Sequence, residues 1–358
     1  MVEQVGIGVI GVGTIAEMNH LPGYQRQSDA RIVAVADINW QRAKTVAAKF
    51  GAPYVYADYR ELLANPEVHA VSVCTPNFQH ASVSIDAIQA GKHVLSEKPP
   101  ALSTAEAQAV EAAAVANGRV YMVCLNHRFR PEVQLLKRYV EAGEFGELYY
   151  AKTAMLRRRG SPGGWFAQKK LSGGGALIDI GVHMLDVTRY VLGNPRPAQV
   201  LGITRQKIGS YFLEEYRSYT PADMRGVERR PENWAGDADE LAIAVVRMEP
   251  DITLYLEVSW ALNLEKDATS TEIFGTKAGA RLEPFTIFTE EMGRLVDKSP
   301  RVQPIPYVET HARAIRHFLD CIHTGEQPLS DAKQAVVTMQ ILDAIYESSE
   351  KGTLITLS

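Results

Sequence analysis

An aspartate and a histidine four residues apart, Asp179 and His183, lie in an otherwise apolar stretch, and a run of three glycines precedes them. On a helix this spacing stacks both side chains on one face. Buried polar groups cost free energy unless they are paired, so the two residues need a partner or a task. Three interpretations fit the pair by itself: an acid–base couple, two metal ligands, or a hydrogen bond in the core. The glycines would let backbone approach a ligand closely.

The composition narrows the possible classes of protein. A chain of 358 residues exceeds the usual size of a single core, so we expect two domains. The net charge of −4 and the absence of a long basic run argue against nucleic-acid binding. No segment has the apolar length of a membrane span, and the N-terminus does not resemble a signal peptide. The three cysteines are far apart in sequence, which predicts reduced thiols in a cytoplasmic protein, with no disulfide framework and no metal.

A dinucleotide fingerprint opens the chain. Residues 5–10 form an apolar strand, and Gly11-x-Gly13-x-x-Ala16 follows it. The fingerprint can also be aligned to begin at Gly6, but that first register leaves a shorter strand before the glycines. We therefore prefer the second register, which begins at Gly11. Its glycines allow a tight turn that admits a pyrophosphate, whose charge the N-terminus of a helix beginning at Thr14 and Ile15 stabilises.

The next predicted strand, residues 30–36, ends at Asp37. A carboxylate at the end of a second strand can accept hydrogen bonds from the ribose hydroxyls of an adenosine. The same charge would repel a 2′-phosphate, so NAD is favoured over NADP. Arg42 and Lys44 follow on the next helix and leave that preference open.

Strands and helices continue to alternate to about residue 125, which predicts a doubly wound parallel sheet. Ligands of such sheets lie beyond the carboxyl ends of the strands. Polar residues follow three of these ends and are candidate cofactor contacts, although turn or helix-cap roles fit several of them equally well. They are Thr75, Asn77 and His80, then Glu97 and Lys98, then Asn126, with Arg128 nearby as a candidate substrate contact.

Lys98 precedes two prolines, which stiffen the backbone and disfavour a helix at the lysine itself. A solvated loop is the ordinary place for a lysine. Its position at the ligand-binding edge of the sheet instead favours a role toward the nicotinamide.

Residues 126–358 predict a second domain, of the α/β class, with an open, largely antiparallel or mixed sheet, because several strands follow one another without intervening helices. Trp165, on a glycine-rich loop, could pack against a sugar ring or form a hydrophobic plug. Residues 205–240 could be a lid or an assembly arm. Two helices, at residues 308–323 and 330–349, are expected to cover the junction with the first domain, residues 1–125.

Taken together, these residues predict hydride transfer in a cleft between the domains. Removing hydride from an alcohol carbon requires a base for the hydroxyl proton, and an imidazole oriented by a carboxylate suits that task. Lys98 could polarise the substrate oxygen. This chemistry selects the acid–base interpretation of Asp179 and His183.

The sequence resembles the Gfo/Idh/MocA family of oxidoreductases along nearly its whole length. The resemblance rests on the fingerprint, on Thr75-Pro76-Asn77 with His80, on Glu97-Lys98-Pro99, and on Gly174-Gly175-x-x-x-Asp179-x-x-x-His183. It implies a Rossmann domain and a sugar or cyclitol dehydrogenase that uses NAD or NADP, with an inositol-like substrate. It also implies that Lys98 and His183 touch the reacting hydroxyl, that Asp179 supports both substrate and histidine, and that Glu97 lies near the nicotinamide ribose. Dimers or tetramers formed through the second domain's sheet are expected.

Two other functions remain compatible with the same residues. An NAD-dependent glycosidase of this fold would oxidise and re-reduce a sugar without net redox change. A binding protein without turnover would retain the nucleotide site alone. A zinc alcohol dehydrogenase is disfavoured because the cysteines lack ligand spacing.

Overall fold

The computed structural model describes residues 4–208 and 236–357. The chain divides into two compact units. The first comprises Met1–Asn126 together with Pro306–Val336, and the second comprises His127–Ile305 together with Val337–Ser358. The sequence placed all residues after 125 in the second domain, whereas here residues 306–336 pack with the first unit.

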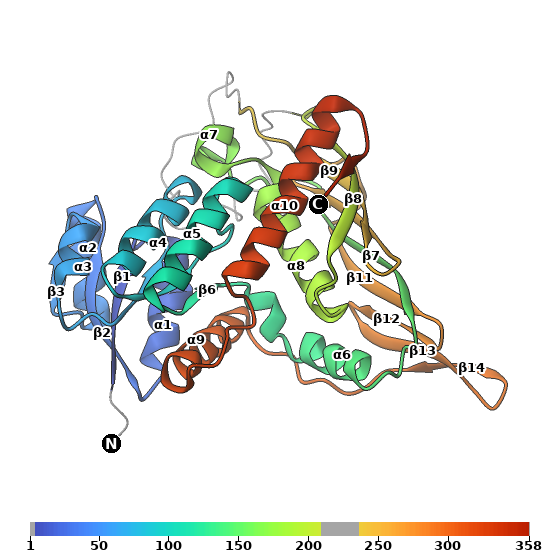
Figure 1. The fold of residues 1–358 in the computed structure, drawn as a ribbon, viewed down its shortest axis with the longest axis horizontal. Coiled ribbons are helices and arrows are strands. Elements are labelled where there is room, and N and C mark those ends of the chain that lie inside the picture. The colour runs from blue at the N-terminus through green and yellow to red at the C-terminus, as the bar shows by residue number, and fades with distance from the viewer. Residues whose placement is uncertain (1–3, 209–235, 358) are drawn as a thin grey trace. The chain divides into compact units, whose positions relative to one another are not determined.

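The first unit contains a six-stranded sheet in the order β3-β2-β1-β4-β5-β6, in which every pair of neighbours is parallel (Figure 1). This arrangement confirms the predicted doubly wound fold. The strand order reverses between β1 and β4, which is where ligands of such sheets bind. The strands are β1 (Val5–Ile10), β2 (Ala30–Ala36), β3 (Tyr54–Tyr56), β4 (Ala70–Val73), β5 (His93–Ser96) and β6 (Tyr121–Val123).

The helices of this unit begin and end at residues that the sequence marks. Asn39 caps α2 by accepting a hydrogen bond from the Arg42 amide, and Gly51 ends that helix with a left-handed φ of 74°. Ser103 caps α5 in the same way. The helical segments are η1 (Ala16–His20), α1 (Leu21–Gln25), α2 (Trp40–Phe50), α3 (Tyr59–Ala64), η2 (Asn77–Gln79), α4 (His80–Gln89), α5 (Thr104–Asn117) and α9 (Tyr307–Thr324).

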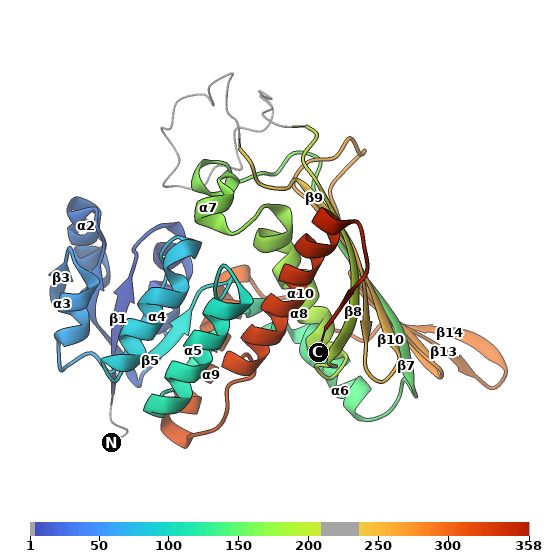
Figure 2. The same cartoon turned by 45° about the horizontal axis from the view of Figure 1, so that its top comes forward.

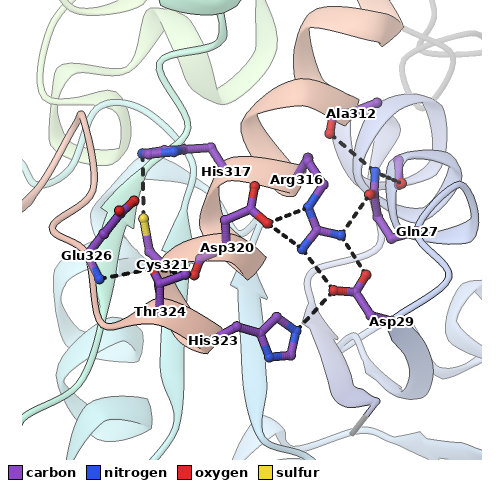
Figure 3. A network of polar contacts seen from close by, with 11 residues as sticks. Gln27, Asp29, Ala312, Arg316, His317, Asp320, Cys321, His323, Thr324 and Glu326 are labelled. Carbon is purple, nitrogen blue, oxygen red and sulfur yellow. Dashed lines mark hydrogen bonds and ion pairs between the residues drawn. The ribbon is translucent and has the colours of Figure 1, made fainter. Parts of the chain in front are cut away.

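Helix α9 joins the first unit although it lies about 180 residues beyond β6 in sequence. Its Ile315 and Phe318 side chains are fully buried. A polar network fastens it to the loop before β2, where the guanidinium of Arg316 donates to both carboxylate oxygens of Asp29 at 2.6 and 2.8 Å (Figure 3). His323 contacts the same carboxylate at 3.0 Å. The amphipathic pattern predicted the helix, and these contacts assign it to the first unit.

The second unit contains a nine-stranded mixed sheet in the order β14-β13-β12-β11-β7-β10-β9-β8-β15 (Figure 2). Strands β7 and β10 are parallel, and all other neighbours are antiparallel. The predicted mixed sheet is therefore confirmed, although the hairpin of β13 and β14 was not foreseen. The strands are β7 (Leu148–Leu156), β8 (Pro197–Arg205), β9 (Leu241–Met248), β10 (Ile252–Ser259), β11 (Ala268–Gly275), β12 (Ala278–Leu282), β13 (Phe285–Glu291), β14 (Arg294–Lys298) and β15 (Ile355–Thr356).

The central helix of this unit is α8 (Val182–Val191), all ten residues of which are buried. It continues from a π-helical turn, η5 (Leu177–Gly181). The remaining helical segments are η3 (Asn126–Phe129), α6 (Pro131–Glu141), η4 (Gly164–Ala167), α7 (Lys169–Ser172) and α10 (Ala332–Lys351), the last of which spans the boundary between the two units in sequence.

Most of the segment predicted as a lid or arm, residues 205–240, lies outside the described residues, which omit 209–235. In the part of the chain that the structure describes, no helix combines the length and apolar character needed to cross a membrane.

Candidate active site

The fingerprint turn lies against the end of β4. Gly11 has φ of 83°, and a Cβ atom at this position would lie 2.7 Å from the carbonyl oxygen of Cys74. Only glycine fits such a turn without moving backbone. Helical structure begins at Thr14, as the second register predicted. The turn therefore has the shape that admits a pyrophosphate at a helix N-terminus.

The Asp37 side chain lies beside this turn. One carboxylate oxygen accepts a hydrogen bond from the Val12 amide at 2.9 Å, and the other accepts from the Asn39 amide at 2.7 Å. Two backbone donors fix the carboxylate at the end of β2 and leave further lone pairs for hydroxyl donors. This geometry suits an adenosine ribose, so the residues present fit a dinucleotide cofactor.

His80 holds two loops of the first unit together. Its ring nitrogens contact the carbonyl oxygens of Pro99, at 2.6 Å, and of Thr75, at 2.8 Å, and the side chain is buried. A neutral imidazole donates to one of these carbonyls, and only a protonated one donates to both. Burial lowers the pKa of His80, and the two acceptors oppose that shift. His80 thus braces the loop after β4, which carries Thr75 and the buried Asn77, against the connection that follows Lys98.

The Lys98 backbone is held from two sides. Its amide donates to a carboxylate oxygen of Glu97 at 3.2 Å, and the carbonyl of the next residue, Pro99, contacts His80. The structure therefore places Lys98 in a braced connection at the carboxyl end of β5, as the sequence indicated.

A residue that the sequence reading overlooked, His20, contacts Glu97. Its Nε2 atom lies 2.8 Å from a Glu97 carboxylate oxygen, and its Nδ1 atom lies 3.0 Å from the Ser72 hydroxyl. Burial disfavours a charged imidazole, but the neighbouring Cys74, Cys124 and Glu97 side chains raise the pKa of His20 well above its usual value. Burial also opposes ionisation of Glu97, yet the hydrogen bond and charge of His20 lower the pKa of that carboxyl to about 2. The two residues form a buried ion pair.

The cysteines are closer to this pair than their sequence spacing suggested. His20, Glu97 and Cys124 each place a potential metal-ligating atom within 4.8 Å of the others. Burial raises the pKa of the Cys124 thiol to about 12, so the thiol beside the His20–Glu97 pair is protonated. The arrangement of charges is that of an ion pair beside a neutral thiol.

The end of β6 is joined to α9. The Asn126 side chain, a predicted cofactor contact, donates to the Thr310 hydroxyl at 2.8 Å and is buried. The next residue of α9, His311, lies edge-on to His20, with ring centroids 6.0 Å apart. Burial lowers the pKa of His311 to about 4, so the imidazole beside the His20–Glu97 pair is neutral.

In the second unit, Asp179 and His183 lie on consecutive helical segments. Asp179 is in the π-helical turn η5, and His183 is in the first turn of α8. The indole nitrogen of Trp260 donates to a carboxylate oxygen of Asp179 at 3.0 Å. The ring of His127 stacks on His183, with centroids 4.6 Å apart and an interplanar angle of 20°. The sequence reading did not assign Trp260 or His127 to the site, because their partners are remote in sequence.

The glycines before this pair do not provide room for a ligand as expected. A Cβ atom on Gly174 would lie 1.9 Å from the Tyr346 hydroxyl, and one on Gly175 would lie 1.8 Å from the Asp239 carbonyl oxygen. The Asp239 carboxylate accepts hydrogen bonds from the Gly175 and Leu177 amides at 2.7 and 3.0 Å. The small residues are needed for this close packing, through which Asp239 satisfies the amides that open the helix.

Two predicted substrate residues have partners within the second unit. Arg128 is fully buried, and its guanidinium donates from two nitrogens to the Asp186 carboxylate, with the shortest contact at 2.5 Å. This pairing balances the charge of Arg128, and its role as a substrate contact stays a prediction. Trp165 stacks on Phe166, with centroids 3.8 Å apart.

Comparison with known proteins agrees with this geometry. Residues 5–125 match the model of an oxidoreductase family with an NAD-binding Rossmann fold, and residues 133–281 match the GFO/IDH/MocA C-terminal domain. The chain belongs to the Gfo/Idh/MocA family. Its first unit is accordingly an NAD-binding Rossmann domain, and the protein is an oxidoreductase.

Several relatives of this Gfo/Idh/MocA protein carry assigned activities. It is 33% identical to D-glucoside 3-dehydrogenase of Escherichia coli over 354 residues, which covers 98% of this chain and 97% of the relative. It is 26% identical to the scyllo-inositol 2-dehydrogenase (NAD⁺) of Bacillus subtilis, covering 100% and 97%. A solved levoglucosan dehydrogenase in complex with NADH and L-sorbose superposes with a TM-score of 0.87 at 24% identity over 99% of both chains, a likeness in fold.

Proposed function

We propose that this protein is an NAD-dependent dehydrogenase that oxidises a ring hydroxyl of a sugar, with a D-glucoside as the leading substrate class. The observation that carries the proposal is the Asp179–His183 pair, a carboxylate and an imidazole one helical turn apart, with the carboxylate bound by Trp260. In a family whose first domain binds NAD, such a pair supplies the acid–base group that alcohol oxidation requires.

In this proposal the two units have separate tasks. NAD, when bound, would supply the acceptor for the hydride of the carbon that bears the reacting hydroxyl. His183 removes the hydroxyl proton, so the alcohol becomes a ketone as NADH forms and one proton is released. Lys98 donates a hydrogen bond to the substrate oxygen and stabilises the negative charge that develops there. Asp179 orients the imidazole and favours its protonated form.

The similarity to relatives favours a glucoside over an inositol as the substrate. The D-glucoside 3-dehydrogenase is 33% identical to this chain, whereas the scyllo-inositol 2-dehydrogenase is 26% identical, over nearly full length in both cases. Both substrates present secondary ring hydroxyls, so the chemistry is common to them.

The experiment is a screen of purified protein with NAD and a panel of D-glucosides, free aldoses and inositols, read by NADH absorbance and by mass spectrometry of the product. We expect NADH and a keto-glucoside in equal amounts. Release of aglycone without accumulation of NADH would identify the glycosidase instead. NADH binding with no turnover on any member of the panel would contradict the proposal.

We also propose that Asp37 sets the preference for NAD. Its carboxylate is fixed beside the fingerprint turn by the Val12 and Asn39 amides, where it would repel a 2′-phosphate. Asp37→Ala should narrow the ratio of kcat/KM for NAD over NADP. An unchanged ratio would remove Asp37 from the ribose site.

Assembly through the second unit's sheet is a further part of the proposal. Leu201 of β8 lies opposite Val245 of β9, which lies opposite Tyr255 of β10. Leu201 is 45% exposed and Val245 is 37% exposed, so an apolar row faces outward from the sheet. We expect light scattering to detect dimers or tetramers. The substitution Leu201→Lys should lower the molar mass of the assembly. A monomeric wild-type protein would contradict assembly through this face.

A further inference from the structure

A chain of buried hydrogen bonds runs from α1 to the lysine connection of the first unit. The Tyr24 hydroxyl contacts the Ser72 hydroxyl at 2.8 Å, and Ser72 contacts Nδ1 of His20 at 3.0 Å. Nε2 of His20 contacts one oxygen of the Glu97 carboxylate at 2.8 Å, and the other oxygen accepts from the Lys98 amide at 3.2 Å. These hydrogen bonds therefore link three elements of the first unit, α1, β4 and η1, to the main chain of Lys98 through Glu97.

The members of this network are shielded from water. Tyr24, Ser72 and His20 are at most 1% exposed, and Glu97 is 6% exposed. Burial raises the pKa of Tyr24 well above its usual value, so the phenol stays neutral. His311 is the other imidazole that faces the pair, and it is neutral because burial lowers its pKa to about 4. Of these two imidazoles, His20 therefore carries the charge that faces the Glu97 carboxylate, and the charge of Lys98 also lowers the pKa of Glu97.

We propose that His20 is a positioning residue for Lys98. By holding the Glu97 carboxylate, it fixes the acceptor to which the Lys98 amide is bound, while His80 holds the next carbonyl, that of Pro99. His20 touches no reacting atom in this account and acts only through the lysine. The inference rests on the proposed function, because it assigns Lys98 to the substrate oxygen.

The test is a double-mutant cycle of His20→Leu and Lys98→Ala. His20→Leu removes both polar contacts of the ring and should lower kcat by about 10- to 100-fold, since a small displacement of a catalytic group has effects of that size. In the Lys98→Ala background the same change should cost less than about threefold, because two residues that act as a unit are not additive. His20→Gln keeps a donor for Glu97 and should recover most of the lost kcat.

His93→Gln is the matched control. His93 lies at the opposite end of β5, where its ring accepts a hydrogen bond from the Val120 amide at 3.0 Å. The control should lower the melting temperature and leave kcat unchanged. If His20→Leu loses the same factor with and without Lys98, its effect is structural and the positioning role is overturned, while sugar oxidation by the wild type would leave the proposed function standing.

A second measurement does not depend on turnover. Nitrogen-15 NMR of the imidazoles in the protein without substrate should detect a protonated His20 at pH 7.5, and Glu97→Gln should abolish that signal. A neutral His20 at this pH would overturn the ion pair. Stoichiometric zinc in the purified wild type that is lost in His20→Leu would also overturn it, because Cys124 and Glu97 would then be ligands. Absence of NADH formation with every sugar, together with a protonated His20, would contradict only the proposed function.

Discussion

The two units hold their reactive groups by different means. In the first, the carboxylate next to Lys98 is paired with a buried imidazole that carries a charge. In the second, the Asp179 carboxylate accepts from the indole of Trp260, and His183 stacks on His127. In the first unit a group of opposite charge holds the carboxylate. In the second unit a neutral hydrogen-bond donor holds the carboxylate, and an aromatic ring stacks on the histidine.

This difference predicts how each unit responds to substitution. Removing one member of a buried ion pair leaves an uncompensated charge, which is strongly destabilising. Removing a neutral donor loses one hydrogen bond, which contributes less. Substitution at His20 or Glu97 should therefore cost more stability than substitution at Trp260.

The largest effect is expected at His183, the proposed proton acceptor. His183→Ala should lower kcat/KM by roughly two to four orders of magnitude, as the loss of general acid–base catalysis does. The measurement is steady-state NADH formation with the best substrate of the panel. Thr188→Ala, on the same helix, removes a hydroxyl that donates to the Met184 carbonyl and should leave kcat near normal. Near-normal activity of His183→Ala would remove the histidine from the chemistry.

The next largest effect is expected at Asp239, which accepts hydrogen bonds from amides at the start of the helical segment that carries Asp179. Asp239→Ala removes the acceptor for two backbone amides and for the Tyr346 hydroxyl, and should lower the free energy of unfolding by about 1–3 kcal/mol. Tyr346→Phe removes only one of the three donors and should cost less. Urea unfolding of both variants tests the order. Equal losses would mean that the helix amides gain little from Asp239.

A smaller effect is expected at the neutral donor. Trp260→Phe keeps an aromatic ring but loses the N–H that Asp179 accepts, so kcat should fall about fivefold, the equivalent of about 1 kcal/mol for one hydrogen bond. His20→Leu should lower the melting temperature more than Trp260→Phe does, because it leaves the buried Glu97 carboxylate without its partner. The reverse order would contradict this difference between the two units.

The smallest effect lies at the ion pair between α9 and the loop before β2. The hydrogen bond from Arg316 outweighs burial and lowers the pKa of Asp29 to about 2. A carboxyl whose pKa is depressed in the folded state stabilises the fold above its unfolded pKa of about 4, and this contribution is lost as pH falls toward 2. Arg316→Gln should therefore lower the melting temperature slightly at pH 6, and the difference from wild type should vanish near pH 2. A difference that is independent of pH would contradict the assignment.

The sequence predicted elements that have strong local patterns. Strands β1, β7 and β9 begin and end where alternation and apolar runs placed them, and the N-cap at Ser103 begins α5 as expected. Strand β3, at the edge of its sheet, has only three residues and gave no such pattern. The hairpin of β13 and β14 is largely exposed, so its sequence carries little apolar alternation.

What the sequence determined by itself is the set of residues at the ends of strands and helices. Asp37, Lys98 and the Asp179–His183 pair follow from spacing, because the repeat of a βα unit or a helix fixes where such residues lie. The tertiary structure decided their partners. His20 and Glu97 are 77 residues apart, Asp179 and Trp260 are 81 apart, and Gly175 and Asp239 are 64 apart. Sheet order and helix packing bring these side chains together, and no local pattern encodes such pairings.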